Sequence, residues 1–419
     1  MSTPDRIDDV DALRGFALLG ILLVNIMAFA SAFYGLEISD PAFGGILDRS
    51  VHFVIALFFE MKFYLLFSFL FGYSFTLQMR SAEKSGEAFV PRLLRRQMGL
   101  WLIGLAHAVL LFHGDILTTY AVLGIVLLML KNRSDGALFR LAKWLVLILA
   151  VVWGTLGILI TLDPVPLDRS AILSAAEAAE LAFQGDWQAV IGQHLTELNS
   201  VWIILVLLQA PCALAMFLLG LIAGRRKTLA RPEENTALFQ RLVRTGLWIG
   251  LPGAVIYAYV SVEMPESPIA VIALSIGLAT GPLLTGAYVG AMMLLFGSET
   301  GHSLRNLLAC RPHGAVQLSA AVADRGADLP WLRPWSHRPG RAFGKRADRA
   351  CDLCRPALHQ PLVDGPFRLW PARMDPALHH HRPRAAVAPP GGGALTDTSQ
   401  FPQPMLPGAF GAGHFRFLA

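Results

Sequence analysis

Charged residues are scarce in this chain of 419 residues, at 16% of the sequence, whereas hydrophobic residues make up 54%. Soluble domains average about 25% charged and about 45–50% apolar residues. Four cysteines are too few for a disulfide framework. The low charge and the long apolar runs exclude a soluble, disordered or collagen-like protein as the overall class. The sequence therefore predicts an all-α fold, a polytopic transmembrane helical bundle followed by a disordered tail.

The last part of the chain, residues 301–419, lacks isoleucine, tyrosine and glutamate and contains a single lysine, Lys345. It nevertheless holds 14 arginines, 15 of the 26 prolines and 8 of the 12 histidines. GC-rich DNA yields this composition when it is read out of frame. We therefore assign 1–308 to the membrane bundle and interpret 309–419 as a frameshifted, disordered tail. A genuine Pro/Arg-rich disordered segment is the alternative.

Eight apolar runs before residue 300 are candidate membrane spans, because a transmembrane helix needs about 20 mainly apolar residues. Two of the runs are longer than one crossing needs, so we expect tilt or a break in them. Two others are short and joined by a tight turn. The eight expected spans are 13–33, 51–79, 97–113, 115–131, 142–162, 200–223, 243–262 and 269–297.

Basic residues concentrate in every second loop. The Lys- and Arg-rich loops are 80–96, 131–143 and 224–244, and the loops poor in these residues are 35–50, 163–199 and 263–268. Cytoplasmic loops carry the excess of Lys and Arg, so we expect a multi-pass protein of the bacterial inner membrane with a cytoplasmic N-terminus. The net charge of +5 therefore reflects membrane topology and not nucleic-acid binding. Within 163–199, helical spacing predicts a short external helix.

Polar residues inside an apolar span need a partner or a function. Asp11 and Arg14 open the first span three residues apart, so they can pair on one helix face. Asn25 lies about halfway along the same span, where an amide usually bonds another helix. The alternative for the pair is an interfacial ion pair that only sets topology.

Glu60 and Lys62 lie inside the second expected span, two residues apart. Residues at this spacing do not face each other on a regular helix. Each side chain therefore needs its own partner, or the helix is broken between them. Their depth favours a water-lined cavity, and the alternative is that both lie near an interface and snorkel.

A histidine–carboxylate group is expected at the external end of the third and fourth spans. His107, His113 and Asp115 flank the turn there, and Tyr120 follows with a further hydroxyl. Histidine and carboxylate together can do general acid–base work near neutral pH. They are equally consistent with a polar turn whose aspartate caps the next helix.

The tail contains a Cys-x-x-Cys motif at Cys351 and Cys354, which is similar to half of a zinc knuckle. A second pair at zinc-finger spacing is absent from the sequence. An out-of-frame reading makes the motif a chance occurrence, so we expect no metal site.

Three motifs resemble the YeiB-like family, the domain-of-unknown-function family numbered 418. They are RIDDVDALRGFALLGILLVNIMAF at 6–29, EMKFYLLFSFLFGYSF at 60–75 and IGLAHAVLLFHGDILTTYAVLGI at 103–125. The resemblance extends in outline to about residue 308. The family usually continues with a segment like GRMALTNYLLQS and further membrane helices, which this chain lacks in readable form.

The family resembles, more remotely, transmembrane acyltransferases such as the lysosomal heparan-glucosaminide acetyltransferases. Arg14, Gly15 and Asn25 match their Arg-Gly opening and mid-span asparagine. Their catalytic histidine lies after the first span, where His52 is the nearest by position but lies in dissimilar surroundings. The resemblance implies acyl-CoA as a co-substrate and no resident cofactor.

Two functions follow from these residues. In an acyltransferase, His107 or His113 is the base, Asp115 orients it, and Asn25 holds the acyl carbonyl. Arg14 and the basic loops attract the phosphates of acyl-CoA, and an envelope sugar or amine is the acceptor. In a secondary transporter, Asn25, Glu60 and Lys62 line the path. Asp11, Arg14, Glu60, Lys62 and Tyr120 are the expected substrate-binding residues in the bundle, and an inactive truncated product is a third alternative.

Sequencing the gene across codons 295–330 from fresh template tests the frameshift interpretation. With suitable synonymous codons, the stretch Arg311–Ala321 reads GRMALSNYLLQ one base later. We expect a one-base error whose correction restores this membrane-compatible frame. If the bases stand as given, the chain is a truncated family member with an aberrant tail.

Overall fold

A computed structural model describes residues 8–298 except 37, 165 and 166, together with residues 301, 304, 305 and 308. All of these residues belong to one compact unit. The expected disordered tail, 309–419, and its Cys-x-x-Cys motif lie outside the described residues. The frameshift and the absence of a metal site therefore stay predictions.

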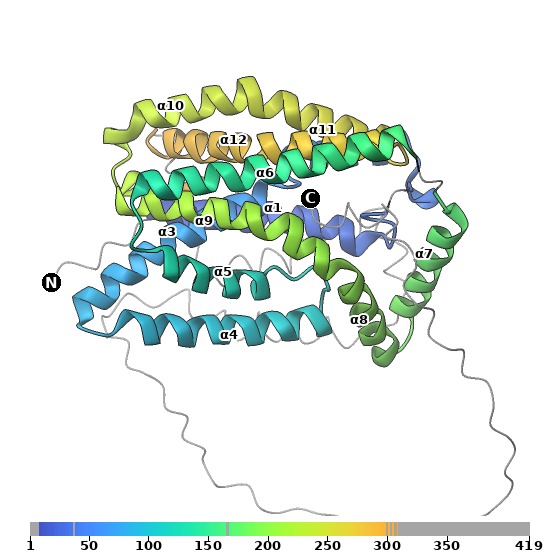
Figure 1. The fold of residues 1–419 in the computed structure, drawn as a ribbon, viewed down its shortest axis with the longest axis horizontal. Helices are drawn as coiled ribbons and strands as arrows, with labels where there is room; N and C mark the ends of the chain where they lie inside the picture. Colours follow the sequence, from blue (N-terminus) through green and yellow to red (C-terminus); the bar gives the residue numbers. More distant parts are fainter. Residues whose placement is uncertain are drawn as a thin grey trace, which may run out of the picture. The chain divides into compact units, whose positions relative to one another are not determined.

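The described part of the chain is helical and contains no strand, which confirms the all-α prediction (Figure 1). Two π-helical turns, η2 (Leu205–Gln209) and η5 (Gly246–Gly250), interrupt long helices. The α-helices are α1 (Asp8–Ala30), α2 (Ile46–Phe58), α3 (Lys62–Ser85), α4 (Phe89–Leu110), α5 (Leu117–Leu130), α6 (Asp135–Leu162), α7 (Arg169–Gln184), α8 (Trp187–Ile204), α9 (Ala210–Arg225), α10 (Thr236–Thr245), α11 (Leu251–Glu263) and α12 (Ile269–Phe296).

Six helical stretches in the described part are long and apolar enough to cross a membrane, judged by length and composition. They are Asp9–Ala30, Ile46–Ser85, Asp135–Leu162, Trp187–Arg225, Glu233–Glu263 and Ile269–Phe296. The other two expected spans correspond to α4 and α5, which lie side by side and run in opposite directions (Figure 1). α5 has only 14 residues, and the first turns of α4 carry Arg92, Arg95 and Arg96.

The expected external loop at 163–199 contains two helices instead of one. α7 is the short helix that the spacing predicts, whereas α8 begins at Trp187 and continues through η2 into α9. The helical stretch that contains the sixth expected span therefore starts before residue 200, because α8 extends the apolar run with Glu197 as its only charged residue. The expected span, 200–223, lies within this stretch.

The second expected span is broken, as its length and its charges predict. α2 ends at Phe58 and α3 begins at Lys62, with Met61 in the left-handed region at φ 64°. A bulky side chain rarely adopts this conformation, so the surrounding packing must hold it there. Met61 is 2% exposed. The break turns the backbone and places Glu60 between two helices.

The core depends on a close approach of α3 and α9. The two helices meet through glycines: a Cβ at Gly72 would overlap the backbone carbonyl of Phe217, and one at Gly220 would overlap that of Phe69. Small residues at such crossings let helix backbones pack closely where both surroundings are apolar. This contact fixes α3, and hence the break before it, relative to the rest of the bundle.

The two ends of the bundle differ in charge. The three basic loops lie together at one end, the left of Figure 1, which we call the basic end. Arg225 and Arg226 each contact Asp135 at 3.0 Å, and Arg80 donates to the Gly224 carbonyl at 2.8 Å. The connections α1–α2, α4–α5, α6–α7 and α11–α12 lie at the opposite end, which we call the cavity end (Figure 1). The predicted alternation of loop charge therefore corresponds to two distinct ends.

Replacing Gly72 by alanine tests the α3–α9 crossing. A Gly-to-Ala change inside a helix normally stabilises it by roughly 0.5–1 kcal/mol. At Gly72 the added methyl group meets backbone, so we expect a loss of about 1–3 kcal/mol in the free energy of unfolding. Gly99→Ala is the matched control, because nothing lies within 4 Å of its Cβ position. Equal thermal stability of the two variants in detergent would contradict the packing.

Candidate functional site: a cavity around His52 and Glu60

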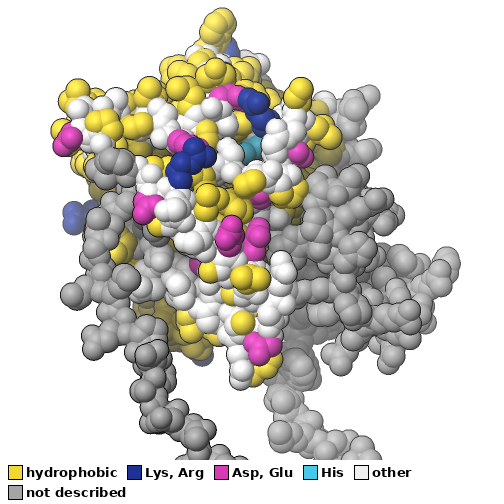
Figure 2. Space-filling view, turned by 90° about the vertical axis from the view of Figure 1, so that its right-hand side faces the viewer, with side chains coloured by type: hydrophobic (Ala, Val, Ile, Leu, Met, Phe, Trp, Pro, Cys, Tyr) yellow, Lys and Arg dark blue, Asp and Glu magenta, His cyan; other side chains and the backbone are white. Residues whose placement is uncertain are grey.

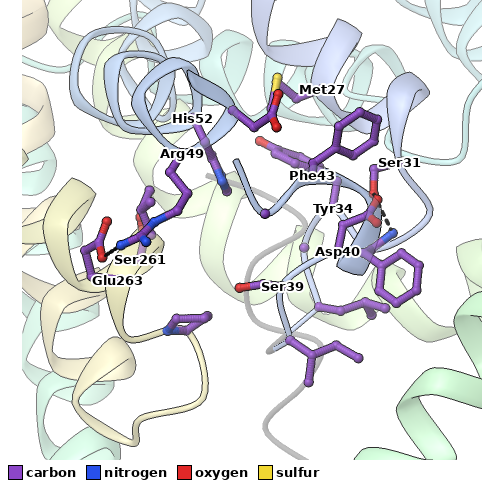
Figure 3. Close-up of a pocket in the computed structure, with 18 of the residues that line it drawn as sticks. Met27, Ser31, Tyr34, Ser39, Asp40, Phe43, Arg49, His52, Ser261 and Glu263 are labelled. Atoms are coloured by element: carbon purple, nitrogen blue, oxygen red, sulfur yellow. Dashed lines mark hydrogen bonds and ion pairs between the residues drawn. The ribbon is translucent and has the colours of Figure 1, made fainter. Parts of the chain in front are cut away.

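A cavity of about 670 Å³ opens at the cavity end of the bundle. Its walls come from the segment after α1, the first turns of α2 and the α11–α12 connection (Figure 3). Charged side chains of both signs and a histidine gather on this face of the molecule (Figure 2). Its volume lies within the range of about 300–1,000 Å³ that is typical of small-molecule sites.

Glu60 is the buried centre of this region, with only 4% of its surface exposed. Tyr34 donates a hydrogen bond to one carboxylate oxygen at 2.8 Å, and Tyr257 donates to the other at 3.0 Å. The two tyrosines come from the segment after α1 and from α11. The break between α2 and α3 orients the Glu60 side chain toward both tyrosines. Three parts of the chain that are distant in sequence are therefore joined at one carboxylate.

His52 lies on α2, two helical turns before Glu60, and lines the cavity (Figure 3). Its Nε2 atom is 4.0 Å from a carboxylate oxygen of Glu60, and 31% of its side chain is exposed. A histidine with one side toward a cavity and a carboxylate nearby has the arrangement of a general base. The carboxylate can also stabilise the imidazolium that forms when the base takes a proton.

Polar contacts close the sides of the cavity. Arg49 of α2 forms an ion pair with Glu263 at the end of α11, and Ser31 bonds Asp40 in the α1–α2 connection (Figure 3). Behind this wall, burial and the neighbouring carboxylates of Asp40 and Glu177 raise the pKa of Glu180 on α7. The cavity end therefore carries a concentration of negative charge.

Lys62 has a partner separate from that of Glu60, as their spacing predicts. Its ammonium donates to the Ala56 carbonyl at 2.8 Å and lies 5.4 Å from the centre of the Tyr257 ring. An ammonium at the last carbonyls of a helix stabilises that end of the helix dipole. Lys62 does not line the large cavity, so its contacts indicate a role in holding the end of α2.

The predicted histidine–carboxylate group at the α4–α5 turn is partly assembled. His107 Nδ1 lies 3.1 Å from one oxygen of Asp115, whose other oxygen accepts from the Thr118 backbone at 2.8 Å. Asp115 thus caps α5, which is the structural alternative that the sequence left open. The His107 side chain is one-third exposed.

His113 points away from that pair and toward α8. Its Nδ1 atom lies 2.5 Å from Glu197, and its ring centre lies 6.0 Å from that of His194. His194 in turn contacts the Val109 carbonyl at 3.1 Å. His107, His113 and Asp115 do not line the large cavity. The contacts of His113 and His194 tie the α4–α5 turn to α8.

The remaining predicted residues are spread along the bundle. Asp11 and Arg14 pair at 2.5 Å, as their spacing predicts, and Arg14 also donates to Ser74 at 2.6 Å. Asn25 lies about 16 Å further along α1, at about 1.5 Å per residue, and lines a separate small cavity. Tyr120 is 1% exposed, and its hydroxyl bonds Ser68 and the Tyr64 carbonyl inside the core.

Sequence reasoning missed Tyr34 and Tyr257 and gave His52 only a positional mention. Tyr34 and His52 flank an acidic external loop. The sequence signal for His52 was its place beside a span that contains a glutamate. Tyr257 lies in an apolar run with no local signal. Its role depends on the fold, because 197 residues separate it from Glu60.

No group of three metal-ligating side chains occurs among the residues that the structure describes. Within the same residues, Cys212 is a buried free cysteine. The arrangement around Glu60 is thus one of hydrogen bonds and ion pairs between side chains.

The helical stretches and the polar cavity at one end define a class: an integral membrane protein with a small-molecule-sized site. Residues 223–311 match the family described as "Protein of unknown function (DUF418)". The "Uncharacterized protein YxaH" of Bacillus subtilis is 30% identical over 285 residues, which cover 62% of this chain and 68% of that protein. The chain belongs to the YeiB-like DUF418 family, as its motifs predict.

Two further relatives match shorter segments. The "Uncharacterized protein YeiB" of Escherichia coli is 26% identical over 186 residues, covering 43% of this chain and 44% of that protein. The "Uncharacterized 39.9 kDa protein in amylase 3'region" of Bacillus acidopullulyticus is 39% identical over 137 residues, covering 32% and 37%. The matches thus span less than half the length of these two proteins. No solved structure is significantly similar to the chain.

Removing the Tyr257 hydroxyl tests the contacts of Glu60. Tyr257→Phe leaves one carboxylate oxygen without its buried donor, so we expect the free energy of unfolding to fall by about 1–3 kcal/mol. Tyr259→Phe on the same helix is the matched control, because that side chain is 55% exposed. Thermal unfolding of both purified variants is the measurement. An unchanged midpoint for Tyr257→Phe would show that the hydrogen bond contributes nothing.

Proposed function

We propose that the protein is a transmembrane acyltransferase that moves an acyl group from acyl-CoA to an envelope acceptor. The observation that carries the proposal is the His52–Glu60 pair on the wall of the large cavity. The motif resemblance to transmembrane acyltransferases supports it, because their catalytic histidine also follows the first span. The names of the relatives in the previous subsection state no activity, so the proposal rests on the site and on the motifs.

The acceptor occupies the large cavity in this proposal. A space of about 670 Å³ suits a molecule with several hydroxyl or amino groups, and the wall offers serine hydroxyls, carboxylates and aromatic rings. The acidic rim favours an acceptor that donates hydrogen bonds. The acceptor reaches the site from the side of the membrane opposite the basic loops, which face the cytoplasm by the positive-inside rule.

The donor binds from the basic end. The phosphates of acyl-CoA are attracted by the basic loops and by Arg14, which Asp11 and Ser74 hold in place. The thioester then extends along α1 toward the middle of the bundle, where Asn25 lies. α1 therefore connects the two substrates, with the donor at its first turns and the acceptor beyond its last turn.

The reaction is a transfer of the acyl carbon from sulfur to oxygen or nitrogen. His52 takes the proton of the acceptor hydroxyl or amine as that atom forms a bond to the thioester carbonyl carbon. The carbon–sulfur bond then breaks, and the CoA thiolate leaves and takes up a proton. Glu60 stabilises the positive charge on His52, and Tyr34 and Tyr257 hold Glu60 in position.

His107 and His113 remain alternative bases, and comparing three substitutions distinguishes them. General-base catalysis contributes about 10²–10⁴-fold, so His52→Gln should lower the rate of acyl transfer from acyl-CoA at least 100-fold. His107→Gln and His113→Gln are the controls and should keep most of the activity. If only a control variant lost activity while remaining folded, the general base would be the histidine replaced in that variant, at the α4–α5 turn.

A secondary transporter is the second candidate, and the break between α2 and α3 favours it. Discontinuous helices with buried ionisable groups are typical of transporter binding sites, and Glu60 and Lys62 flank such a break. Substrate accumulation in vesicles, driven by a proton gradient and without acyl transfer, would support this function over the first.

A further inference from the structure

A second, smaller cavity of about 70 Å³ lies deeper in the bundle. It is lined by α1, by the α2–α3 break, by the α4–α5 turn and by Gln209 at the end of η2. Tyr34 lines both cavities, and its hydroxyl is the one that bonds Glu60. We call the smaller space the inner cavity. It lies behind Tyr34, next to the pair that would activate the acceptor.

Polar groups without strong partners line the inner cavity. Gln209 is 6% exposed, and its amide oxygen is buried without a hydrogen bond in the described part of the chain. The Tyr64 hydroxyl is likewise buried without a strong hydrogen bond, next to the weakly bonding thiol of Cys212. Asn25, which is only partly buried, adds an amide to the lining of the same space. Buried polar groups are normally paired, so two such side chains around one space indicate a ligand or water.

The rest of the lining is apolar. Ile21, Val24 and Ala28 lie on the same side of α1 as Asn25, and Met61 and Phe63 come from the α2–α3 break. One water needs about 10–15 Å³ and two to four polar partners. The inner cavity is several times larger than that, yet far too small for a fatty acyl chain. Its size and lining match a carbonyl group that carries a short alkyl end.

We propose that the inner cavity binds the acyl group of the donor and restricts it to short chains, from acetyl to about butyryl. Tyr64 and Gln209 join Asn25 as donors to the carbonyl oxygen, because rotation of the Gln209 amide presents its NH₂ group. The same donors stabilise the negative charge that develops on that oxygen when the acceptor attacks. This inference rests on the proposed acyl transfer. It adds short-chain acyl-CoA as the donor class, and Tyr64 and Gln209 as residues that bind the acyl carbonyl.

Acyl-chain selectivity tests the size of the inner cavity. The purified full chain in lipid nanodiscs should transfer acetyl from acetyl-CoA at least tenfold faster than octanoyl from octanoyl-CoA. The double substitution Ile21→Ala and Val24→Ala widens the cavity and should bring this ratio toward one. Leu18→Ala on the same helix is the control, because Leu18 is 40% exposed. Wild-type preference for octanoyl, or an unchanged ratio in the widened variant, would overturn the inference.

A binding measurement separates this inference from the proposed function. The ligand is the ketone analogue of acetyl-CoA, in which a methylene group between sulfur and carbonyl prevents transfer. By calorimetry, Gln209→Leu and Tyr64→Phe should each weaken its binding about three- to tenfold. Tyr259→Phe is the control and should bind as the wild type does.

The transfer and binding measurements together distinguish a failure of the proposed function from a failure of the inner-cavity inference. If the wild type binds the analogue, with the expected losses in the variants, but transfers no acyl group, the proposed function fails and the inner cavity stands as an acyl site. If the wild type does not bind the analogue, or if Gln209→Leu and Tyr64→Phe bind it as tightly as the wild type does, the inner cavity holds water only and the inference is wrong.

Discussion

The hydrogen bonds from two tyrosines to the buried carboxylate of Glu60 are the interaction on which the rest of the site depends. A carboxylate inside an apolar bundle is costly unless donors surround it. Tyr34 and Tyr257 supply these donors from opposite sides. To meet them, the chain must leave the helix at Phe59 and resume it at Lys62, which places Met61 in a left-handed conformation. The break, the cavity and the position of His52 all follow from this arrangement.

The strain at the break is balanced by packing on either side of it. Lys62 binds the Ala56 carbonyl near the end of α2, and the glycines of α3 and α9 hold α3 against the centre of the bundle. The end of one helix and the start of the next are thus fixed independently. A polar site on such a support keeps its geometry because packing and hydrogen bonds hold its side chains in place.

The separation of charge between the two ends is consistent with the proposed transfer between two substrates. Arginines and lysines collect at the basic end, whereas carboxylates surround the large cavity at the other. Under the proposed function, an anionic donor and a hydroxyl- or amine-bearing acceptor are therefore attracted to opposite ends. α1 passes close to both, with Arg14 in its first turns and Asn25 about three-quarters of the way along. The three family motifs supply residues along this path. The first motif contains Arg14 and Asn25, the second contains Glu60, and the third contains Gly114.

Much of the fold could be predicted from local spacing. Asp11 and Arg14 pair because they are three residues apart, and the charges at 60 and 62 predict a break because they are two apart. Pairings between distant segments had no such signal: Glu60 and Tyr257 meet only after the bundle forms, and His113 bonds Glu197 of a helix that was expected to be a loop. The histidines of the α4–α5 turn were therefore weighted above His52. Contacts set by local spacing could be predicted from the sequence, whereas contacts between distant segments depend on packing and could not.

The accessibility of His52 from the cavity end tests the account most directly. The measurement is the reaction of His52→Cys with a membrane-impermeant maleimide in intact cells, with the tail cysteines replaced by serine. Ser85→Cys at the basic end is the matched control. We predict that the cysteine at 52 reacts in intact cells, whereas the cysteine at 85 reacts only after the cells are made permeable. A cysteine at 52 that never reacts, or that reacts only in permeable cells, would contradict a water-filled cavity open to the outside.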